Sequence, residues 1–591
     1  MMQLASKTAL LTAVFLVVGR ASAVPRQVAG EDPSKLPRLT LVLSLDQFRA
    51  DYLERFGPFF CQDGFRRIFK EGVNCQGSVY RHAKTATGPG HAVIGTGAYP
   101  HRSGIVGNTW RDRKTLKQVY CVAGPKGASP EHLLVRTLAE HWKKRFPARS
   151  RILSISFKDR AAVLMAGGGG DGVFWFDGVV GRLRSSPWYD SRPATPARTA
   201  FKTWVAALAK GGQDGRLIDV ALGATWNELP CPSKDPTLQK AWSQLEPDTR
   251  QGESARNGWQ PQFPRQFDKS RGPRYYAQVT ESPWGDRFLI DCLLSAIDSK
   301  DVRLGRRDGA VDLALVSLSS LDYIGHAHGP WSHEVRDEMI RLDRRLASLF
   351  RSLDERIGKD AWTLAMTGDH GVANSQERSR RLGQDAGIVS QYRPRKDAGL
   401  VRARLGDFLL HRFADRFRKG FVKTATDGLG TGLVDGLCLL DDGSLYIRPD
   451  LERVSGIRPS ALLDAVQEFF SKEPYVLQSL RRRDLGQAKE GIPWLAAQSF
   501  HPDRSGDLIL ILKPNWFWQW GRGGATHGSP HVYDRAVPLL FLGRGFASGR
   551  VVPGAGIDDL VPTLAKILGI PTSPIWDGQP LQKALAGDPP R

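Results

Sequence analysis

Residues 39–46 read LTLVLSLD, a run of seven residues rich in leucine that ends at an aspartate. Because the apolar residues are nearly continuous and do not alternate strictly with polar ones, the run predicts a strand buried on both faces. Similar short runs follow at residues 151–156, 311–318, 362–366, 508–512 and 537–542. Helical patterns separate them. Strands that alternate with helices predict a doubly wound α/β fold, with a mostly parallel central sheet and helices on both faces.

Two helices are predicted with defined ends. Residues 334–357 place apolar side chains on one stripe, and Gly358 follows as a stop. Further upstream, Ser129 is a suitable N-cap with Pro130 at the first helical position. We therefore expect a second helix to begin there and to bury Leu138 and Trp142.

Polar residues follow four of the predicted strands. Asp46 follows the first strand, Asp322 follows the strand at 311–318, and Asp369 follows the strand at 362–366. Lys158 and Arg160 follow the strand at 151–156. In open α/β sheets, ligands bind beyond the carboxyl ends of the strands. The sequence therefore predicts a site at that edge of the sheet.

The domain organisation is expected to be one large catalytic domain at residues 38–575 of the 591. Two stretches are predicted to be insertions that cap or border the site, at about 181–278 and 374–507. A linker is expected at 24–37 and a tail at 576–591.

The N-terminus is predicted to be a secretory signal peptide, residues 1–23. It has Lys7, then an apolar run at 8–19, then the small residues Ala21-Ser22-Ala23 as a cleavage site. The apolar run is shorter than the roughly 20 residues that a membrane-spanning helix needs. We therefore expect export to the periplasm, with the extracellular medium as the alternative, and no transmembrane segment in the mature chain.

The chain carries a net charge of +22. A basic field attracts nucleic acids and other polyanions, but no nucleic-acid-binding motif accompanies the charge here. We expect no specific nucleic-acid partner, and at most a loose attraction to an anionic cell envelope. The six cysteines include no C-x-x-C pair, so they are not expected to bind zinc. One to three disulfides are compatible with export, and Cys61 with Cys75 is the closest pair in sequence.

Three short motifs carry residues of the metal-binding type. Asp322 and His326 are four apart, so one helical turn would bring both onto one metal ion. Asp369 and His370 are adjacent, which suits a strand end or a turn. His527 lies in a glycine-rich segment, THG, that could bring one more imidazole from a distance.

A hydroxyl nucleophile is predicted in the stretch KTATGPGH, residues 84–91. This stretch is expected to start a helix, where free backbone N–H groups and the helix dipole favour a phosphate group. Thr87 is the candidate, and Thr85 is its rival. A threonine hydroxyl is a weak nucleophile until a base or a metal ion activates it.

Taken together, the motifs resemble those of the alkaline phosphatase superfamily, in particular its secreted bacterial branch with a threonine nucleophile and a Lys-x-Arg phosphate clamp. Type I phosphodiesterases and nucleotide pyrophosphatases are relatives of that branch. The resemblance spans about residues 38–570. The matching stretches are LSLDQF (43–48), TGPGH (87–91), GIVGN (104–108), KDRAAV (158–163), LDYIGH (321–326), TGDHG (367–371) and THGSPH (526–531).

The resemblance implies a fold of the alkaline phosphatase type and two Zn²⁺ ions per chain. It assigns one zinc to Asp322, His326 and His527. It assigns the other to Asp46, Asp369 and His370, together with Thr87 as the nucleophile. Asn108, Lys158 and Arg160 would hold the remaining phosphate oxygens.

The implied activity is hydrolysis of phosphate monoesters at alkaline pH through a covalent phosphothreonine. Small phosphorylated molecules are the expected substrates, and a monomer is the expected state. The clamp favours monoesters, because two cations suit the extra charged oxygen of a monoester dianion.

Alternatives stay open at this point. A phosphodiesterase or nucleotide pyrophosphatase of the same superfamily would share the metal ligands but lack the clamp of Lys158 and Arg160. A sulfatase is disfavoured, because no C/S-x-P-x-R segment occurs. A non-catalytic exported protein that binds polyanions is the distant alternative. His531 is a rival of His527, and we expect it to be structural.

Overall fold

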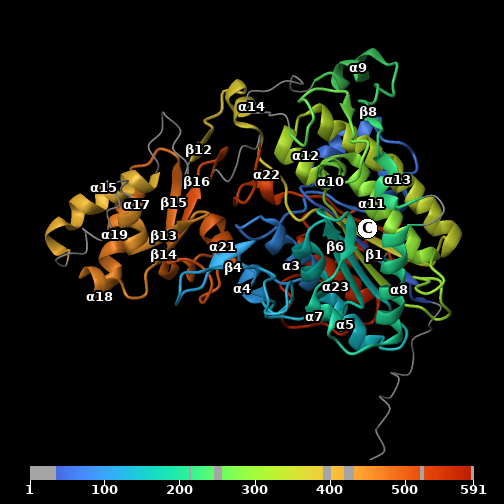
Figure 1. The fold of residues 1–591 in the computed structure, drawn as a ribbon, viewed down its shortest axis with the longest axis horizontal. Coiled ribbons are helices and arrows are strands. Elements are labelled where there is room, and N and C mark those ends of the chain that lie inside the picture. Colours follow the sequence, from blue (N-terminus) through green and yellow to red (C-terminus); the bar gives the residue numbers. More distant parts are fainter. Residues whose placement is uncertain are drawn as a thin grey trace, which may run out of the picture. The chain divides into compact units, whose positions relative to one another are not determined.

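The computed structural model describes residues 35–211, 215–244, 256–389, 401–417, 431–518 and 525–587 (Figure 1). The predicted signal peptide lies outside the described residues, as do most of the predicted linker and the last four residues of the tail. Within the described ranges, no helix is both long enough and apolar enough to cross a membrane.

Nine strands of the described chain form the main sheet, in the order β19-β2-β18-β11-β1-β10-β5-β6-β7. The five consecutive strands that run parallel are β11 (Trp362–Thr367), β1 (Leu39–Leu45), β10 (Asp312–Leu318), β5 (Ile152–Ser156) and β6 (Gly172–Asp177). The outer strands are β18 (Leu539–Gly543), β2 (Val73–Cys75), β19 (Arg550–Val551) and β7 (Arg182–Arg184). Among them, β18 runs antiparallel to β11 and β7 runs antiparallel to β6. The predicted doubly wound, mostly parallel fold is confirmed.

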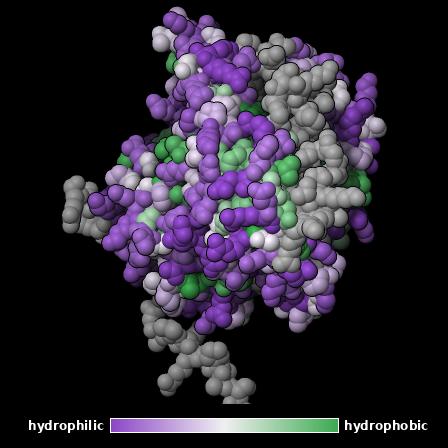
Figure 2. Space-filling view, turned by 90° about the vertical axis from the view of Figure 1, so that its left-hand side faces the viewer, coloured by the Kyte–Doolittle hydropathy of each residue, from purple (hydrophilic) through white to green (hydrophobic). Residues whose placement is uncertain are grey.

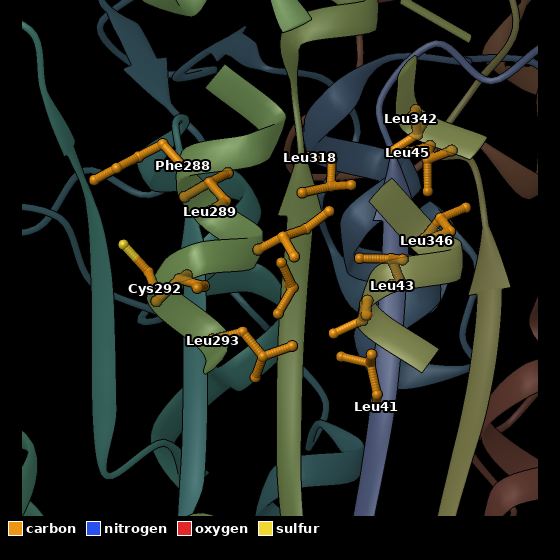
Figure 3. Packing of buried hydrophobic residues seen from close by; sticks show 14 of the residues in the cluster. Leu41, Leu43, Leu45, Phe288, Leu289, Cys292, Leu293, Leu318, Leu342 and Leu346 are labelled. Atoms are coloured by element: carbon orange, nitrogen blue, oxygen red, sulfur yellow. The ribbon is translucent and has the colours of Figure 1, made fainter. Parts of the chain in front are cut away.

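Side chains of β1 point alternately to two layers of helices. Leu41, Leu43 and Leu45 share one cluster with side chains of α11 (Pro283–Asp298) and α13 (His333–Arg356), and Figure 3 shows Leu342 and Leu346 of α13 beside them. Val42 belongs to a second cluster with side chains of α3 (Thr87–Thr96), α6 (Asp159–Ala166) and α23 (Leu560–Ile567). Because both faces of the sheet are covered, every residue of β1 is buried, and the run contains leucine, valine and small hydroxyl residues but no charge.

Removing one leucine from this core is expected to destabilise the fold strongly. Leu346 on α13 is fully buried against the sheet. Leu346→Ala should lower the free energy of unfolding by about 2–5 kcal/mol, through lost apolar burial and the cavity left behind. Urea denaturation measures the change. Leu382→Ala is the matched control, since Leu382 is 55% exposed. An equal loss in both variants would contradict the packing described here.

The run at 508–512 is a strand, β16 (Leu508–Leu512), but it does not join the main sheet. It pairs antiparallel with β14 (Ser444–Ile447) and β15 (Val476–Arg481), and β13 (Cys438–Asp441) completes this second sheet. The sheet packs with α15 (Val401–Phe413) and α19 (Pro459–Ser471) into its own hydrophobic cluster. A short apolar run predicts burial but carries no information about its partner strand, which is why the expectation of a parallel sheet was wrong for this run.

The helix expected from Ser129 begins eight residues later. Its N-cap is Thr137, which precedes α5 (Leu138–Arg145) and forms a capping box with Glu140. The hydroxyl of Ser129 instead donates to the Glu131 carboxylate at 3.0 Å. The prediction was wrong because the stronger reciprocal cap lies at Thr137. The long helix predicted at 334–357 is confirmed as α13, capped by Ser332.

All six cysteines lie in the described residues and all are free. The suggested Cys61–Cys75 disulfide is therefore absent: Cys75 is buried in β2, and Cys61 contacts Asp343. The surface seen in Figure 2 is mainly hydrophilic with small hydrophobic areas between, as the charged composition leads one to expect.

Other helices and strands surround these layers. The helices are α1 (Asp51–Phe56), α2 (Phe65–Glu71), α4 (Pro100–Ser103), α7 (Pro187–Asp190), α8 (Pro196–Lys210), α9 (Pro236–Trp242), α10 (Pro273–Thr280), α12 (Ser320–His328), α14 (Gln376–Arg381), α17 (Thr431–Leu437), α18 (Leu451–Ser455), α20 (Arg482–Leu485), α21 (Gly491–Gln498) and α22 (Val532–Arg535). The short strand pairs are β3 (Thr109–Arg111) with β4 (Gln118–Tyr120), β8 (Thr225–Trp226) with β9 (Arg265–Gln266), and β12 (Gly387–Val389) with β17 (Trp516–Trp518).

Candidate active site

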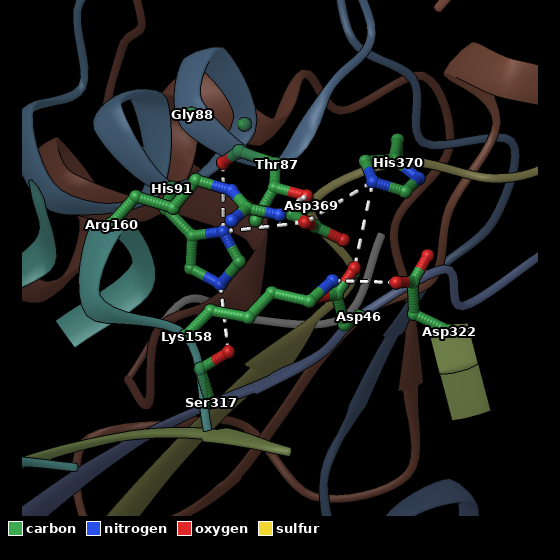
Figure 4. A network of polar contacts seen from close by, with 12 residues as sticks. Asp46, Thr87, Gly88, His91, Lys158, Arg160, Ser317, Asp322, Asp369 and His370 are labelled. Carbon is green, nitrogen blue, oxygen red and sulfur yellow. Dashed lines mark hydrogen bonds and ion pairs between the residues drawn. The ribbon is translucent and has the colours of Figure 1, made fainter. Parts of the chain in front are cut away.

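Polar side chains gather where four neighbouring parallel strands end (Figure 4). Asp46 follows β1, Asp369 follows β11, Asp322 stands on α12 after β10, and Lys158 precedes α6 after β5. Each of these four side chains is at most 5% exposed. The adjacency of the strands explains how residues more than 300 positions apart come together.

One group of metal-type ligands consists of Asp322, His326 and His527. Asp322 and His326 are one turn apart on α12, and the His326 Nε2 lies 3.2 Å from an Asp322 carboxylate oxygen. His527 comes from a loop, and its Nε2 lies 4.0 Å from the same oxygen. The three ligand atoms all lie within 4.8 Å of one another, which is close enough to bind one ion.

A second group consists of Asp46, Asp369 and His370. The His370 Nε2 lies 3.5 Å from Asp46 Oδ1 and 3.4 Å from Asp369 Oδ2. All three of these atoms are buried and have no hydrogen-bond partner. Leaving buried polar atoms unpartnered costs free energy, and a bound cation would satisfy them. The ligand atoms of Asp46 and His370 lie within 4.8 Å of one another and of one from Asp322, and Asp369 adjoins them through His370, so these side chains suit a divalent metal ion.

The surroundings shift the pKa values of Lys158 and of the three histidines in different directions: burial opposes the Asp322 carboxylate at His326, and Asp322 prevails and raises the pKa of that imidazole. Burial alone would lower the pKa of Lys158, but the carboxylates of Asp322 and Asp46 outweigh it and raise the pKa. Burial lowers the pKa of His527 well below its usual value, and the neighbouring His370 adds to this effect. The pKa of His370 is also lowered by its burial. A neutral imidazole is the form that binds a metal ion.

Thr87 is the first residue of α3, and its side chain is buried. Arg160 Nη2 donates a hydrogen bond of 3.3 Å to the Thr87 hydroxyl oxygen. The backbone N–H of Gly88 donates to the Asn108 side-chain oxygen at 2.7 Å. A Cβ on Gly90 would lie 2.2 Å from the Asp369 carbonyl oxygen, so glycine allows α3 to approach the end of β11. The TGPG segment thus places the Thr87 hydroxyl at the site.

Lys158 lies between the two groups of ligands. Its ammonium donates to Asp322 Oδ2 at 2.6 Å and also to Asp46. Arg160 is in the first turn of α6, so the two cations project from one helix start. Figure 4 shows seven of the predicted site residues together: Asp46, Thr87, Lys158, Arg160, Asp322, Asp369 and His370. His326 and His527 adjoin Asp322, and Asn108 contacts the start of α3.

The rival residues make other contacts. The Thr85 hydroxyl donates to the carbonyl oxygen of Ser529 at 2.8 Å. His531 is the N-cap residue of α22, and its Nε2 lies 2.9 Å from the Leu512 carbonyl oxygen. Both side chains therefore bind backbone rather than the carboxylates of the site.

Two residues of the site were not identified from the sequence. Gln47 donates its side-chain N–H to Asp322 at 2.8 Å and its backbone N–H to Asp369 at 3.1 Å. Its backbone has φ of 66°, a strained conformation for a residue other than glycine. The second is His91, whose Nδ1 lies 3.3 Å from Asp369 Oδ2. Position next to Asp46 was the only sequence signal for Gln47.

Comparisons with known proteins agree with this geometry. The protein "Calcium-transporting ATPase" of Myroides odoratus is 28% identical over 576 residues, which cover 94% of this chain and 96% of that protein. "Alkaline phosphatase PafA" of Elizabethkingia meningoseptica is 26% identical over 605 residues, covering 98% of each chain. The crystal structure of wild-type alkaline phosphatase PafA matches 93% of this chain and 99% of its own, with a TM-score of 0.76 and 25% identity.

These similarities confirm the resemblance to the alkaline phosphatase superfamily that the motifs indicated. The model of the family described as Type I phosphodiesterase / nucleotide pyrophosphatase matches residues 40–533, well over half of the chain. The chain belongs to the type I phosphodiesterase / nucleotide pyrophosphatase family.

Proposed function

We propose that the protein hydrolyses phosphate monoesters at alkaline pH, releasing inorganic phosphate by way of a phosphothreonine at Thr87. The single observation that carries this proposal is the position of Lys158 and Arg160. Both cations are held at the start of α6, with Arg160 on the Thr87 hydroxyl and Lys158 between the two ligand groups. The alkaline phosphatases among the similar proteins support the same activity.

Two Zn²⁺ ions are the cofactors that we propose. Asp322, His326 and His527 would hold one, and Asp46, Asp369 and His370 would hold the other next to Thr87. When bound, such a metal pair supplies Lewis-acid stabilisation of the attacking and departing oxygens.

The side chains then have separate roles in the two steps. Arg160, Lys158 and Asn108 bind the non-bridging phosphate oxygens and orient the phosphorus toward Thr87. The Thr87 oxygen loses its proton and bonds to phosphorus as the ester bond to the alcohol breaks, and the alcohol takes up a proton. Water then attacks the phosphothreonine, which releases phosphate and restores the Thr87 hydroxyl.

A phosphodiesterase is the second candidate, because the family model carries that name. The two activities differ in charge at phosphorus. A monoester is a dianion at alkaline pH, whereas a diester carries one charge and a second organic group. The half-buried Arg160 on the Thr87 hydroxyl and the buried Lys158 at the same helix start favour the dianion.

The test compares kcat/KM for p-nitrophenyl phosphate and bis-p-nitrophenyl phosphate, using wild type and the double variant Lys158→Ala/Arg160→Ala. We expect wild type to prefer the monoester. The double variant should lose about 10³-fold on the monoester and less than about tenfold on the diester. Arg113→Ala is the control, since Arg113 pairs with Asp507 in another part of the chain. A wild-type preference for the diester, or equal losses on both substrates, would refute the monoesterase proposal.

Export to the periplasm, a monomeric state and a loose attraction to an anionic envelope also belong to the proposal. The leader-like N-terminus supports export, and the net charge of +22 supports the attraction to an anionic envelope. The domain limits given above stay predictions.

A further inference from the structure

A cavity of about 110 Å³ borders the active site on the side of His527. One wall is the loop Thr526 to Pro530, which carries that histidine. The opposite wall comes from the second sheet, through residues of β13, β14 and β16, and from β17. None of the residues assigned to the reaction other than His527 lines it, so the cavity is a space next to the catalytic groups rather than the catalytic site itself.

The lining combines aromatic and aliphatic side chains with polar ones. Six aromatic side chains of the described residues contribute: Trp110, Tyr446, Trp516, Phe517, Trp518 and Tyr533. Leucine and isoleucine side chains of β16 fill the gaps between them. Such a lining, with a few fixed polar groups, is typical of a pocket for a flat organic molecule.

The charged groups of the lining are three carboxylates and the Lys84 ammonium, and serine and threonine hydroxyls and His527 add further polar groups. Asp441 pairs with Arg111, and Asp442 pairs with Lys84. Asp534 is 1% exposed and accepts hydrogen bonds from Ser529, but its second oxygen has no partner. Because three carboxylates face one ammonium, the lining disfavours an anionic group, whereas a neutral group that donates a hydrogen bond can bind to the free oxygen of Asp534.

The direction in which the alcohol part of a substrate extends follows from the position of the loop Thr526 to Pro530. His527 donates from Nδ1 to the Thr85 carbonyl oxygen, 2.9 Å away, and its Nε2 faces Asp322. Its ring therefore lies at the border between the ligand groups and the cavity. With the phosphoryl group held by Arg160 at Thr87, the alcohol part of a monoester can extend past His527 into the cavity.

We propose that this cavity binds an uncharged aromatic ring of the leaving alcohol, and that the preferred substrates are monoesters of alcohols with such a ring. This inference rests on the proposed function. The size is consistent with a single ring, since engineered apolar cavities of roughly 150 Å³ bind benzene.

The test uses two monoesters, 2-phenylethyl phosphate and ethyl phosphate. Their alcohols differ in the ring and have similar acidity, so the ratio of kcat/KM values reports ring binding rather than leaving-group reactivity. We expect a ratio of roughly tenfold or more in favour of the phenylethyl ester, from burial of the ring.

Phe517→Ala is the informative variant. Phe517 lines the cavity but belongs to no hydrophobic cluster of the described residues, so its loss should spare the core. The ratio should fall about three- to tenfold. Phe408→Ala is the matched control, because Phe408 is likewise half-buried but packs on Phe469 away from the cavity. Ser444→Phe, which fills the cavity from β14, should lower the ratio as well.

Calorimetry with 2-phenylethylphosphonate and ethylphosphonate gives a readout that does not need turnover. A tighter Kd for the phenylethyl compound, weakened by Phe517→Ala and kept by Phe408→Ala, would support the cavity. Equal Kd values, or a preference unchanged in both Phe517→Ala and Ser444→Phe, would overturn it. If the protein bound the phenylethyl compound more tightly but hydrolysed neither ester, the proposal for the cavity would stand and the phosphatase proposal would be refuted.

Discussion

Thr87→Ala is expected to lower kcat/KM for p-nitrophenyl phosphate by about 10⁴-fold or more. The Thr87 hydroxyl is the only group that we assign to attack phosphorus, and it is buried next to Arg160. Water could replace it only poorly, since it would lack a fixed position relative to the bound phosphate. Steady-state assays with saturating zinc measure the loss.

The adjacent threonine supplies the control. Thr85→Ala removes a hydroxyl that bonds to the Ser529 carbonyl oxygen, and we expect a loss of at most about tenfold. Circular dichroism should show that both variants fold. If Thr87→Ala retained activity within about tenfold of wild type, the covalent route would be wrong. A larger loss in Thr85→Ala than in Thr87→Ala would transfer the nucleophile to Thr85.

Much of the fold could be predicted because burial leaves a direct trace in the sequence. The run at 39–45 is continuous because both of its faces are covered, and β1 has the predicted bounds. Asp46, Asp322 and Asp369 could be placed together because parallel neighbouring strands end at one edge. For these three residues, the parallel order of the strands was sufficient to predict that they lie close together.

Other features depend on contacts that no local pattern encodes. The apolar run at 508–512 has both faces buried, one against each of two small clusters, and so has the same pattern as a main-sheet strand. Gln47 is a site residue only because α12 and the end of β11 bring Asp322 and Asp369 to it. The cavity beside His527 unites segments more than 400 positions apart, from Lys84 to Asp534. Contacts between such distant segments can be recognised only in the three-dimensional structure.

Removal of metal by EDTA is expected to abolish hydrolysis, with a loss of at least about 10³-fold, and Zn²⁺ should restore it. The physical reason lies in the buried atoms of Asp46, Asp369 and His370 that have no hydrogen-bond partner. Without a cation they must stay unsatisfied, take up protons or draw in water. Metal analysis of the reconstituted protein should give two zinc ions per chain.

Histidine substitutions decide whether the metal is held where we propose. His527→Ala should reduce the zinc content toward one ion per chain and lower kcat/KM by about 10²-fold or more, because Asp322 and His326 alone leave the ion incompletely bound. His531→Ala, four residues on, should keep both ions, since its ring bonds to the Leu512 carbonyl oxygen. Activity that persists after the EDTA treatment described above would rule out metal-dependent catalysis. A loss of zinc in His531→Ala, with full retention in His527→Ala, would instead reverse the roles of the two histidines.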